Sequence, residues 1–358
     1  MVNRRLQRKL KGMKRRKEKV YDDPDVRKEK LRIKRRRKRI ILAVIAAAVL
    51  TAAGAVLLIG LYNRKQLGLA KQLAAEKRFK EALTEIEKCG EFMVDKHERD
   101  RTGQKIWRNV YCAKMITVEG GTFLMGSEKQ EDEKPVHTVK VSSFMISRYE
   151  VTFDDYEAYC RATGRKVPDD QGWGRGTRPV MRVSWYDAVL YCNWLSRKQG
   201  LTQCYTIDGT EISCNFKADG CRLPAEAEWE FAARGGNMSK GFIWSGSDNP
   251  DEAGWYGRNS GKQTHPAGEK KPNELEIYDM SGNVREWCWD WYDSQYYEKS
   301  PVDNPRGPSG KPNRRLRVLR GGSFSYNALL MRTADRFNLG PESRLSDNGF
   351  RVVRTAVP

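Results

Sequence analysis

One segment near the start of the chain is apolar throughout. Residues 40–62 read IILAVIAAAVLTAAGAVLLIGLY, without a single charge. As a helix rising about 1.5 Å per residue, this segment is long enough to cross a hydrocarbon layer of about 30 Å. A buried core helix normally keeps one polar stripe, and a cleaved signal sequence normally has a short basic leader. The pattern therefore predicts an uncleaved transmembrane anchor over residues 40–62.

Charge is concentrated before this anchor. Residues 1–39 hold twenty Lys or Arg and five Asp or Glu, so they contribute +15 of the net charge of +20. Basic residues flanking a span stay in the cytoplasm, so we expect a cytoplasmic tail and an extracytoplasmic remainder. The tail can attract anionic lipid headgroups or nucleic acid by charge alone, but its only aromatic residue is Tyr21. We expect lipid contact and no specific nucleic acid.

Beyond the anchor, residues 63–110 are strongly charged and carry apolar residues at helical spacing. The stretch AAEKRFKEALTEIEK is similar to one helical hairpin of tetratricopeptide type, which cannot bury its own apolar face alone. We therefore expect a helical stalk or packing collar over residues 63–110. A single compact domain over residues 111–358 fits the remaining length.

Within that domain, the polar pattern first predicts strands and then helices. MITVEGGTFLMGS, from Met115, indicates a strand, a glycine turn and a second strand, and VHTVKVSSFMISRYEV indicates a half-buried strand pair. Thr152 is positioned to cap a helix that stops at Gly164, and Ser184 to cap one that stops at Gly200. The chain after Gly241 is dense in Trp, Gly, Asn and Pro, which favours short strands and long loops. We expect an α+β domain with much irregular structure.

All eight cysteines lie after the anchor, where disulfides can persist if this part of the chain is exported. Cys204 and Cys214 flank the segment CYTIDGTEISC, whose Asp208-Gly209 pair suits a tight hairpin turn. A two-residue turn there would pair position 204 with 213, so a bridge between Cys204 and Cys214 needs a bulge or a longer loop. The chain has no CxxC motif and three histidines, which argues against a cysteine-histidine zinc site.

Four motifs in the last 140 residues carry a family resemblance. They are CRLPAEAEWEFAARGG from Cys221, IYDMSGNVREWCWDWY from Ile277, RVLRGGSF from Arg317 and NGFRVV from Asn348. Together they resemble the formylglycine-generating enzyme family, also called the sulfatase-modifying factor domain. The resemblance covers residues 118–354 and implies a C-type-lectin-like formylglycine-generating-enzyme fold. The family pattern has Thr where this chain has Ala225, so the third predicted helix has lost its capping side chain.

The motif YDMSGNVREW offers oxygen ligands. Asp279, Asn283 and Glu286 lie within eight residues around a glycine, and hard oxygen donors are what calcium prefers. The resemblance implies a calcium site made by the side chains of Asp279 and Glu286 and the carbonyls of Gly282 and Val284. Without the resemblance, polar residues of this kind are commonly turn formers. We expect structural calcium.

The segment after the GGS turn lacks the family's redox ligands. In oxidase members two cysteines in this segment hold copper, but residues 323–349 contain none and the last cysteine is Cys288. Copper prefers soft thiolates, so we expect neither copper nor formylglycine formation. Iron is not expected either, because His137 and His265 are isolated. The groove candidates in this segment are Tyr326, Asn327, Met331, Arg332 and Arg336.

Two hypotheses of function follow. The first is a non-catalytic binding or scaffolding module of the bacterial cell envelope, which recognises a protein or a glycan through the loops between Tyr326 and Arg336. The alternative is an oxidoreductase or protein-maturation factor with an unrecognised metal site.

The alternating Trp287, Trp289 and Trp291 are expected in the core. The later arginines are expected to pair with buried acids or carbonyls, or in part to line the groove and receive an acidic ligand: Arg320, Arg332, Arg336, Arg344 and Arg351.

Overall fold

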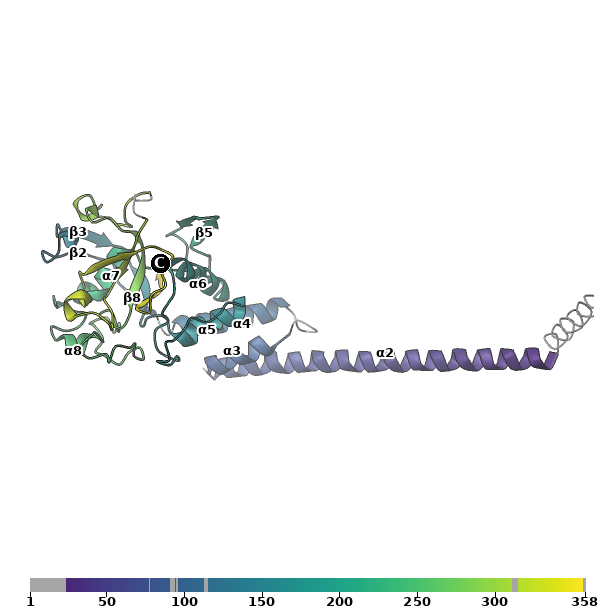
Figure 1. Ribbon diagram of the computed structural model, residues 1–358. Coiled ribbons are helices and arrows are strands. Elements are labelled where there is room, and N and C mark those ends of the chain that lie inside the picture. Colours follow the sequence, from purple (N-terminus) through teal and green to yellow (C-terminus); the bar gives the residue numbers. More distant parts are fainter. Residues whose placement is uncertain are drawn as a thin grey trace, which may run out of the picture. The chain divides into compact units, whose positions relative to one another are not determined.

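The computed structural model describes residues 24–76, 78–90, 94, 96–112, 115–310 and 315–356 (Figure 1). Three helices come first along the chain: α2 (Pro24–Ala75), α3 (Phe79–Lys88) and α4 (Lys96–Cys112). Residues 1–23 of the predicted basic tail lie outside the described residues. The chain divides into two compact units, one made of residues 1–72 and 84–99 and the other of residues 73–83 and 100–358.

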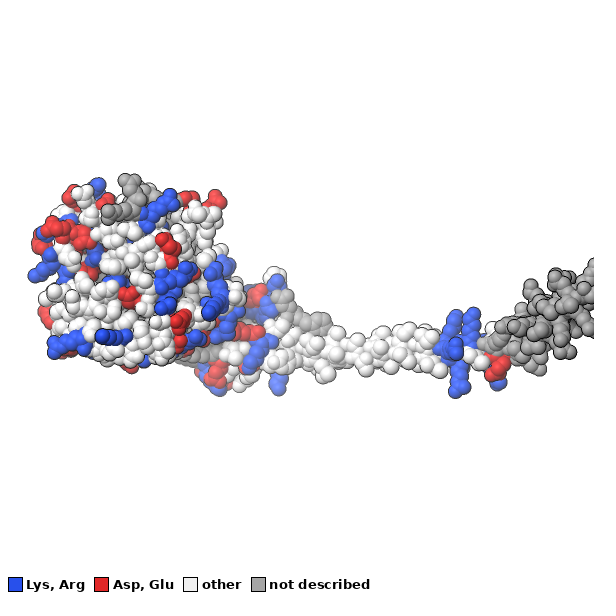
Figure 2. Space-filling model, in the orientation of Figure 1, with Lys and Arg blue, Asp and Glu red and all other residues white. Residues whose placement is uncertain are grey.

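Helix α2 runs through the whole predicted anchor without a break. Its 52 residues correspond to about 78 Å at 1.5 Å per residue. The side chains of residues 40–59 are all exposed, and Figure 2 shows this uncharged stretch following a cluster of basic side chains. Within the part of the chain that the structure describes, Leu31–Ala75 is the one helix long and apolar enough to cross a membrane. It is therefore a candidate membrane span by length and composition.

The first unit folds the end of α2 back on later residues. The Asn63 side chain accepts a hydrogen bond from the Gly90 backbone N–H at 3.1 Å, and the Cys89 thiol donates to the Asn63 carbonyl at 3.3 Å. Lys71 and Glu98 form an ion pair at 2.6 Å. The helical pattern predicted over residues 63–110 is confirmed, because α2, α3 and α4 together cover most of it, whereas the role of a stalk or collar stays a prediction.

Two four-stranded sheets form the framework of the second unit. One has the order β1-β4-β12-β7, made of Met115–Val118, Phe144–Ser147, Val353–Thr355 and Cys221–Arg222. The other has the order β10-β9-β8-β11, made of Arg336–Leu339, Arg317–Arg320, Arg285–Trp291 and Asn348–Gly349. Each sheet joins the last residues of the chain to earlier ones, so the C-terminus is part of the framework.

Two hairpins complete the strands: β2 (Gly121–Met125) with β3 (His137–Val141), and β5 (Tyr205–Asp208) with β6 (Glu211–Cys214). The predicted strands are present, but the expected pairing of neighbours is wrong. β1 pairs with β4 and β2 pairs with β3. A strand pattern shows which face is buried and does not identify the partner strand.

The predicted helix boundaries are confirmed. α5 (Phe153–Thr163) begins after Thr152, whose side chain accepts from the Asp155 N–H, and its C-cap is Gly164 at φ 68°. α6 (Trp185–Lys198) begins after Ser184 with a complete capping box. Helix α8 spans Pro250–Ala253. The short 3-10 turns are η1 (Glu131–Glu133), η2 (Gly236–Met238), η3 (Tyr296–Glu298) and η4 (Ala328–Met331).

Helix α7 (Glu226–Ala233) begins without a capping side chain, as predicted from Ala225. The Ala225 N–H donates to the Glu228 carboxylate at 2.9 Å, so half of a capping box remains. The helix lies against β2, β3, β8 and β9 (Figure 1). This position brings its acidic residues into the middle of the domain.

The β5–β6 hairpin turns one residue later than expected. Asp208 pairs with Glu211 and Tyr205 with Cys214, so the turn residues are Gly209 and Thr210. Because Cys204 precedes Tyr205, this register places Cys204 and Cys214 on opposite faces of the hairpin. Both are free thiols. A bridge between them requires a different register and stays a prediction.

Strand β8 separates two hydrophobic cores. Trp287 lies in one core, beside α5 and α6, and Cys288 lies in the other, beside α7. Successive side chains of a strand point to opposite faces, which explains the division. Trp287 is fully buried, as expected, and Trp289 and Trp291 are half-buried. These two, together with Trp185, surround the Arg317 guanidinium at 3.4–4.9 Å from the ring centroids.

Candidate ligand pocket

A pocket of about 770 Å³ opens in the second unit. It lies between the loop of residues 126–130, which leads into η1, and the segment of residues 241–244. Its third side is the η4 region. The lining residues are Gly126, Ser127, Lys129, Gln130, Arg234, Gly241, Phe242, Ile243, Trp244, Asn327, Leu329, Leu330, Arg332, Thr333 and Ala334.

One wall of the pocket is apolar and accessible. Ile243 is 50% exposed and Leu329 is 65% exposed. The wall is held in place by backbone contacts, since the Trp244 indole donates to the Ala328 carbonyl at 2.7 Å and the Thr333 N–H donates to the Ile243 carbonyl at 3.1 Å. Exposed apolar side chains around a cavity are a usual feature of binding sites.

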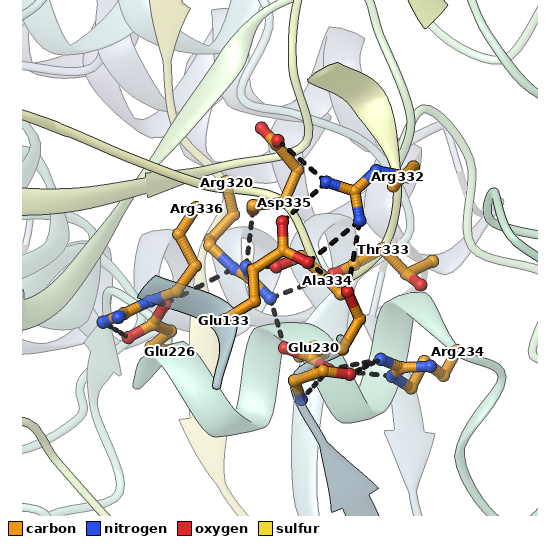
Figure 3. Close-up of polar contacts among 12 residues, drawn as sticks. Glu133, Glu226, Glu230, Arg234, Arg320, Arg332, Thr333, Ala334, Asp335 and Arg336 are labelled. Carbon is orange, nitrogen blue, oxygen red and sulfur yellow. Dashed lines mark hydrogen bonds and ion pairs between the residues drawn. The ribbon is translucent and has the colours of Figure 1, made fainter. Parts of the chain in front are cut away.

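Beneath the pocket lies a buried network of four arginines and four acids (Figure 3). Arg332 binds Glu133 through two hydrogen bonds of 2.9 and 2.6 Å, and Arg336 binds Glu226 through two of 2.7 and 2.9 Å. The remaining members are Arg234, Arg320, Glu230 and Asp335. Two-point pairing of this kind compensates the loss of hydration that burial imposes on each charge.

Arg320 is the centre of the network. Its guanidinium donates to Glu230 and to the carbonyls of Thr333 and Ala334, the last two at 2.9 Å. Burial by itself would raise the pKa of Glu230, but Arg234 and Arg320 hold this pKa below its ordinary value. Burial raises the pKa of Asp335 to about 7, against the opposing effect of Arg332 and Arg320. The network thus contains one acid that titrates near neutrality.

The two arginines of the pocket differ in what they can offer a ligand. The Nε, Nη1 and Nη2 groups of Arg332 all donate to protein acceptors: the Leu329 carbonyl, Ser127, Glu133 and Asp335. Arg234 donates through Nε to Glu230 and through Nη2 to the Gly126 carbonyl. Among the described residues nothing accepts from Arg234 Nη1. Arg332 is therefore structural, while Arg234 keeps one nitrogen for a ligand.

The predicted groove residues are divided by the structure. Asn327 and Arg332 line the pocket, whereas Tyr326, Met331 and Arg336 do not. Met331 is fully buried and Arg336 is 5% exposed. Met331 packs inside the fold and Arg336 neutralises Glu226, so neither is accessible from the pocket in this structure, and a ligand contact by either residue stays a prediction. The pairing expected for the five later arginines is confirmed, with Arg344 bound to Asp187 and Arg351 to Glu286.

Tyr326 belongs to a closed cluster beside the GGS turn. The Arg285 guanidinium lies between the rings of Tyr326 and Phe337, at 3.9 and 3.6 Å from their centroids, and donates to Asp347 at 2.9 Å. Gly322, at φ 68°, lets η4 approach, since a Cβ there would lie 2.3 Å from the Leu330 carbonyl oxygen. Arginine and aromatic side chains therefore fill the space next to this turn.

The predicted calcium motif forms part of a buried acidic cluster. Asp279 Oδ2 accepts from the Gly268 N–H at 2.7 Å, while Oδ1 is buried without a partner among the described residues. Glu150, which the motif does not include, accepts from the Asn283 amide at 2.9 Å and from the Val284 N–H at 3.1 Å. Burial raises the pKa of Glu150 well above its ordinary value and that of Asp279 to about 6. A bound cation would favour the ionised forms of these carboxyl groups and so lower their pKa values.

These residues fit a calcium ion only in part. The free oxygen of Asp279 suits a hard cation. In contrast, both oxygens of Glu286 accept from Arg351 at 2.6 Å, and one also accepts from the Trp229 indole at 2.7 Å. The Asn283 amide is occupied by Glu150 and by the carbonyl of His265. The structure therefore supports Asp279 as a ligand better than Glu286.

Thiols and imidazoles lie outside the pocket. Of the seven cysteines whose side chains are described, six are buried. His137 and His265 contact different parts of the fold, Tyr297 and Trp255 respectively. Across the described ranges there is no group of three His, Cys, Asp or Glu residues arranged to hold a metal.

Sequence reasoning missed two sides of the pocket, residues 126–130 and 241–244. It also missed Glu133 and Glu230, which hold the arginines. The loop sequence GSEKQEDEKP is highly charged, yet charge on a loop usually indicates solvent exposure and not burial. The one available signal was the excess of arginine in the last segment, which requires buried acids elsewhere.

The fold defines a mixed helix and strand domain with a pocket between long loops. A family model described as the sulfatase-modifying factor enzyme 1-like domain matches residues 104–356. The chain belongs to this family, as its four motifs predicted.

Known proteins support the assignment. The chaperone protein LppX of Paenibacillus barcinonensis is 36% identical over 278 residues, covering 67% of this chain and 89% of that protein. The formylglycine-generating enzyme of Streptomyces coelicolor is 30% identical over 307 residues, covering 67% and 89%. Among solved structures, Treponema denticola variable protein 1 matches with a TM-score of 0.60 and 33% identity, covering 68% of this chain and 95% of that one. The expected formylglycine-generating-enzyme fold is confirmed.

Proposed function

We propose that this protein is a membrane-anchored, non-catalytic binding module whose ligand is a protein held at the pocket between residues 126–130, 241–244 and 327–334. The observation that carries the proposal is the chemistry of the pocket lining. It combines an exposed apolar wall with arginines fixed by buried acids, and no cysteine or histidine lines it. Rigid polar groups beside apolar area favour recognition, and neither arginine nor apolar side chains supply a redox ligand.

A protein ligand is preferred over a glycan for two reasons. The name of the related LppX describes a chaperone, which acts on proteins. The pocket also lacks an accessible aromatic platform of the kind that stacks on sugars, because Trp244 is half-buried and its indole N–H is already bonded.

Site-specific photocross-linking in cells tests this placement. A photoreactive phenylalanine analogue at Leu329 or Ile243 should give a discrete protein adduct. The matched control is Ile207, which is 41% exposed on the β5–β6 hairpin and outside the pocket. Equal adducts at all three positions, or none at the pocket positions, would contradict the proposal.

The competing function is an oxidoreductase or maturation factor with an unrecognised metal site. Metal analysis of the full chain, purified in detergent without added metals, separates the two. We expect substoichiometric copper and iron, since the segment of residues 323–349 has no thiol. One equivalent of either metal, together with oxygen consumption, would favour the enzyme.

We also propose structural calcium at Asp279, with the carbonyls of Gly282 and Val284 as further ligands and Glu286 as a positioning residue through Arg351. The unpartnered Asp279 oxygen supports this. Calcium should raise the unfolding temperature of chelator-treated protein, because a ligand bound only by the folded state stabilises it. Asp279→Asn should abolish the shift. If the unfolding temperature of this variant still rises with calcium, the ion binds at another site.

Location completes the proposal. The tail before residue 40 lies in the cytoplasm, where its basic residues contact anionic lipid headgroups, and the family domain faces the outside of a bacterial membrane. The exposed apolar length of α2 and the basic cluster before it support this orientation.

A further inference from the structure

The cations of the pocket point to the class of its ligand. Among the described residues, three basic side chains line it and no acidic side chain does. Each nitrogen of Arg332 already donates to a protein acceptor, so this residue offers a ligand no free hydrogen-bond direction. The remaining two, Lys129 and Arg234, therefore decide the electrostatics of the pocket.

Arg234 is preorganised for a ligand. Its side chain is 23% exposed, and the buried Glu230 fixes it at 2.7 Å. The terminal nitrogen Nη1 carries two N–H groups without an acceptor in the described part of the chain. Because the guanidinium is already held in place, a new hydrogen bond costs little side-chain entropy.

Lys129 adds a mobile positive charge. It is exposed, and its ammonium has no acid partner among the described residues, although its backbone N–H donates to Ser127 at 3.0 Å. The neighbouring Glu128 is exposed and does not line the pocket. An anionic group entering beside Ser127 therefore meets a fixed donor on one side and an adjustable cation on the other.

We infer that the pocket binds an acidic peptide segment: an apolar side chain lies on Phe242, Ile243 and Leu329, and the carboxylate of a neighbouring Asp or Glu binds Arg234 Nη1 and Lys129. This inference rests on the proposed binding function and names the ligand of that site. Arginine and lysine bind a carboxylate more strongly than an amide of the same shape. Specificity for acidic over neutral segments follows from the lining.

The test uses the full chain in neutral detergent and two fluorescein-labelled hexapeptides, Gly-Ala-Leu-Glu-Leu-Gly and the same peptide with Gln in place of Glu. Fluorescence anisotropy at low salt should show about tenfold tighter binding of the Glu peptide, equivalent to about 1.4 kcal/mol. Raising the ionic strength should reduce this preference, because Lys129 is exposed.

Variants assign the effect to the two cations. Lys129→Gln and Arg234→Lys should each reduce the preference for the Glu peptide by about threefold, a modest loss for partly exposed charges. Arg234→Lys keeps a charge beside Glu230, which protects the fold. Lys217→Gln, at an exposed lysine outside the pocket, is the matched control and should change nothing.

The failure of this inference differs from failure of the proposed function. Equal affinity for the two peptides would contradict the inference that the ligand is an acidic segment. The same holds if dodecanoate, a fatty acid, displaces the Glu peptide while the pocket shows no preference between the peptides. Cross-linked adducts at Leu329 would then still support a protein-binding site. If no cross-linked adducts form at Leu329, both the acidic-segment inference and the proposed protein-binding function are contradicted.

Discussion

Single residues in this protein derive their roles from burial. Arg320 and Glu230 are essentially inaccessible to water, so each charge depends on the other. Removing one partner of a buried pair leaves an uncompensated charge, which is far more costly than losing a pair on the surface.

Replacing Glu230 with Gln should lower the free energy of unfolding by about 3–5 kcal/mol, because Arg320 loses its nearest charge partner in the interior and is left with Glu226 at 3.7 Å. Denaturant unfolding of the purified protein measures this. Glu131→Gln is the control, since Glu131 pairs with Lys134 at 2.8 Å in a solvent-exposed position, and it should have no measurable effect. Similar stability of the two variants would show that the network contributes little.

Asp335 should make stability depend on pH. Its pKa is raised by burial to about 7, so the folded state holds a proton between about pH 4 and 7 that the unfolded chain has released. Stability from this group is therefore complete at low pH and decreases as the pH rises through 7. Asp335→Asn should flatten the decline in melting temperature between pH 5 and 8. An unchanged pH profile would assign the decline to other groups.

The sequence predicted the paired arginines but not their partners. Arg332 binds Glu133 across 199 residues, and Arg336 binds Glu226 across 110. Local patterns contain no information on contacts at such separation. For the same reason the sequence did not indicate that the fold buries Met331 and Arg336, whose residue types suit a groove.

At the scale of elements, short-range signals were reliable. Thr152, Ser184 and Gly164 end their helices as expected because capping depends on residues a few positions apart. Strand partners and the β5–β6 turn were not reliable, because strand register depends on packing with distant residues. The loops after residue 241 carry little periodic pattern, which explains why the side of the pocket formed by residues 241–244 was not anticipated.

The unsupported start of α7 offers a stabilising change. Ala225 has the extended backbone of an N-cap, with φ −64° and ψ 152°. Ala225→Ser should let the hydroxyl accept the Glu228 N–H and raise the free energy of unfolding by about 1 kcal/mol. Thermal unfolding measures the gain, with Ala225→Gly as a comparison that adds no acceptor. Destabilisation by serine would show that the 2% exposed site has no room for an oxygen.

At the scale of the whole molecule, the main prediction concerns orientation. An epitope placed after Pro358 should be removed by trypsin added to intact spheroplasts, and an epitope placed before Met1 should be protected until the membrane is broken. The reason is the positive charge that precedes the apolar part of α2. The reverse pattern would place the family domain in the cytoplasm.

The arrangement of the buried network also has a consequence in time. Glu133 and Glu226 leave the ribosome long before Arg332 and Arg336, which neutralise them, whereas Arg234 follows Glu230 closely. Until Arg332 and Arg336 arrive, closing the interior around Glu133 and Glu226 would bury charge without compensation. The domain therefore stays largely unfolded until its last forty residues have been synthesised, and its interior closes only then.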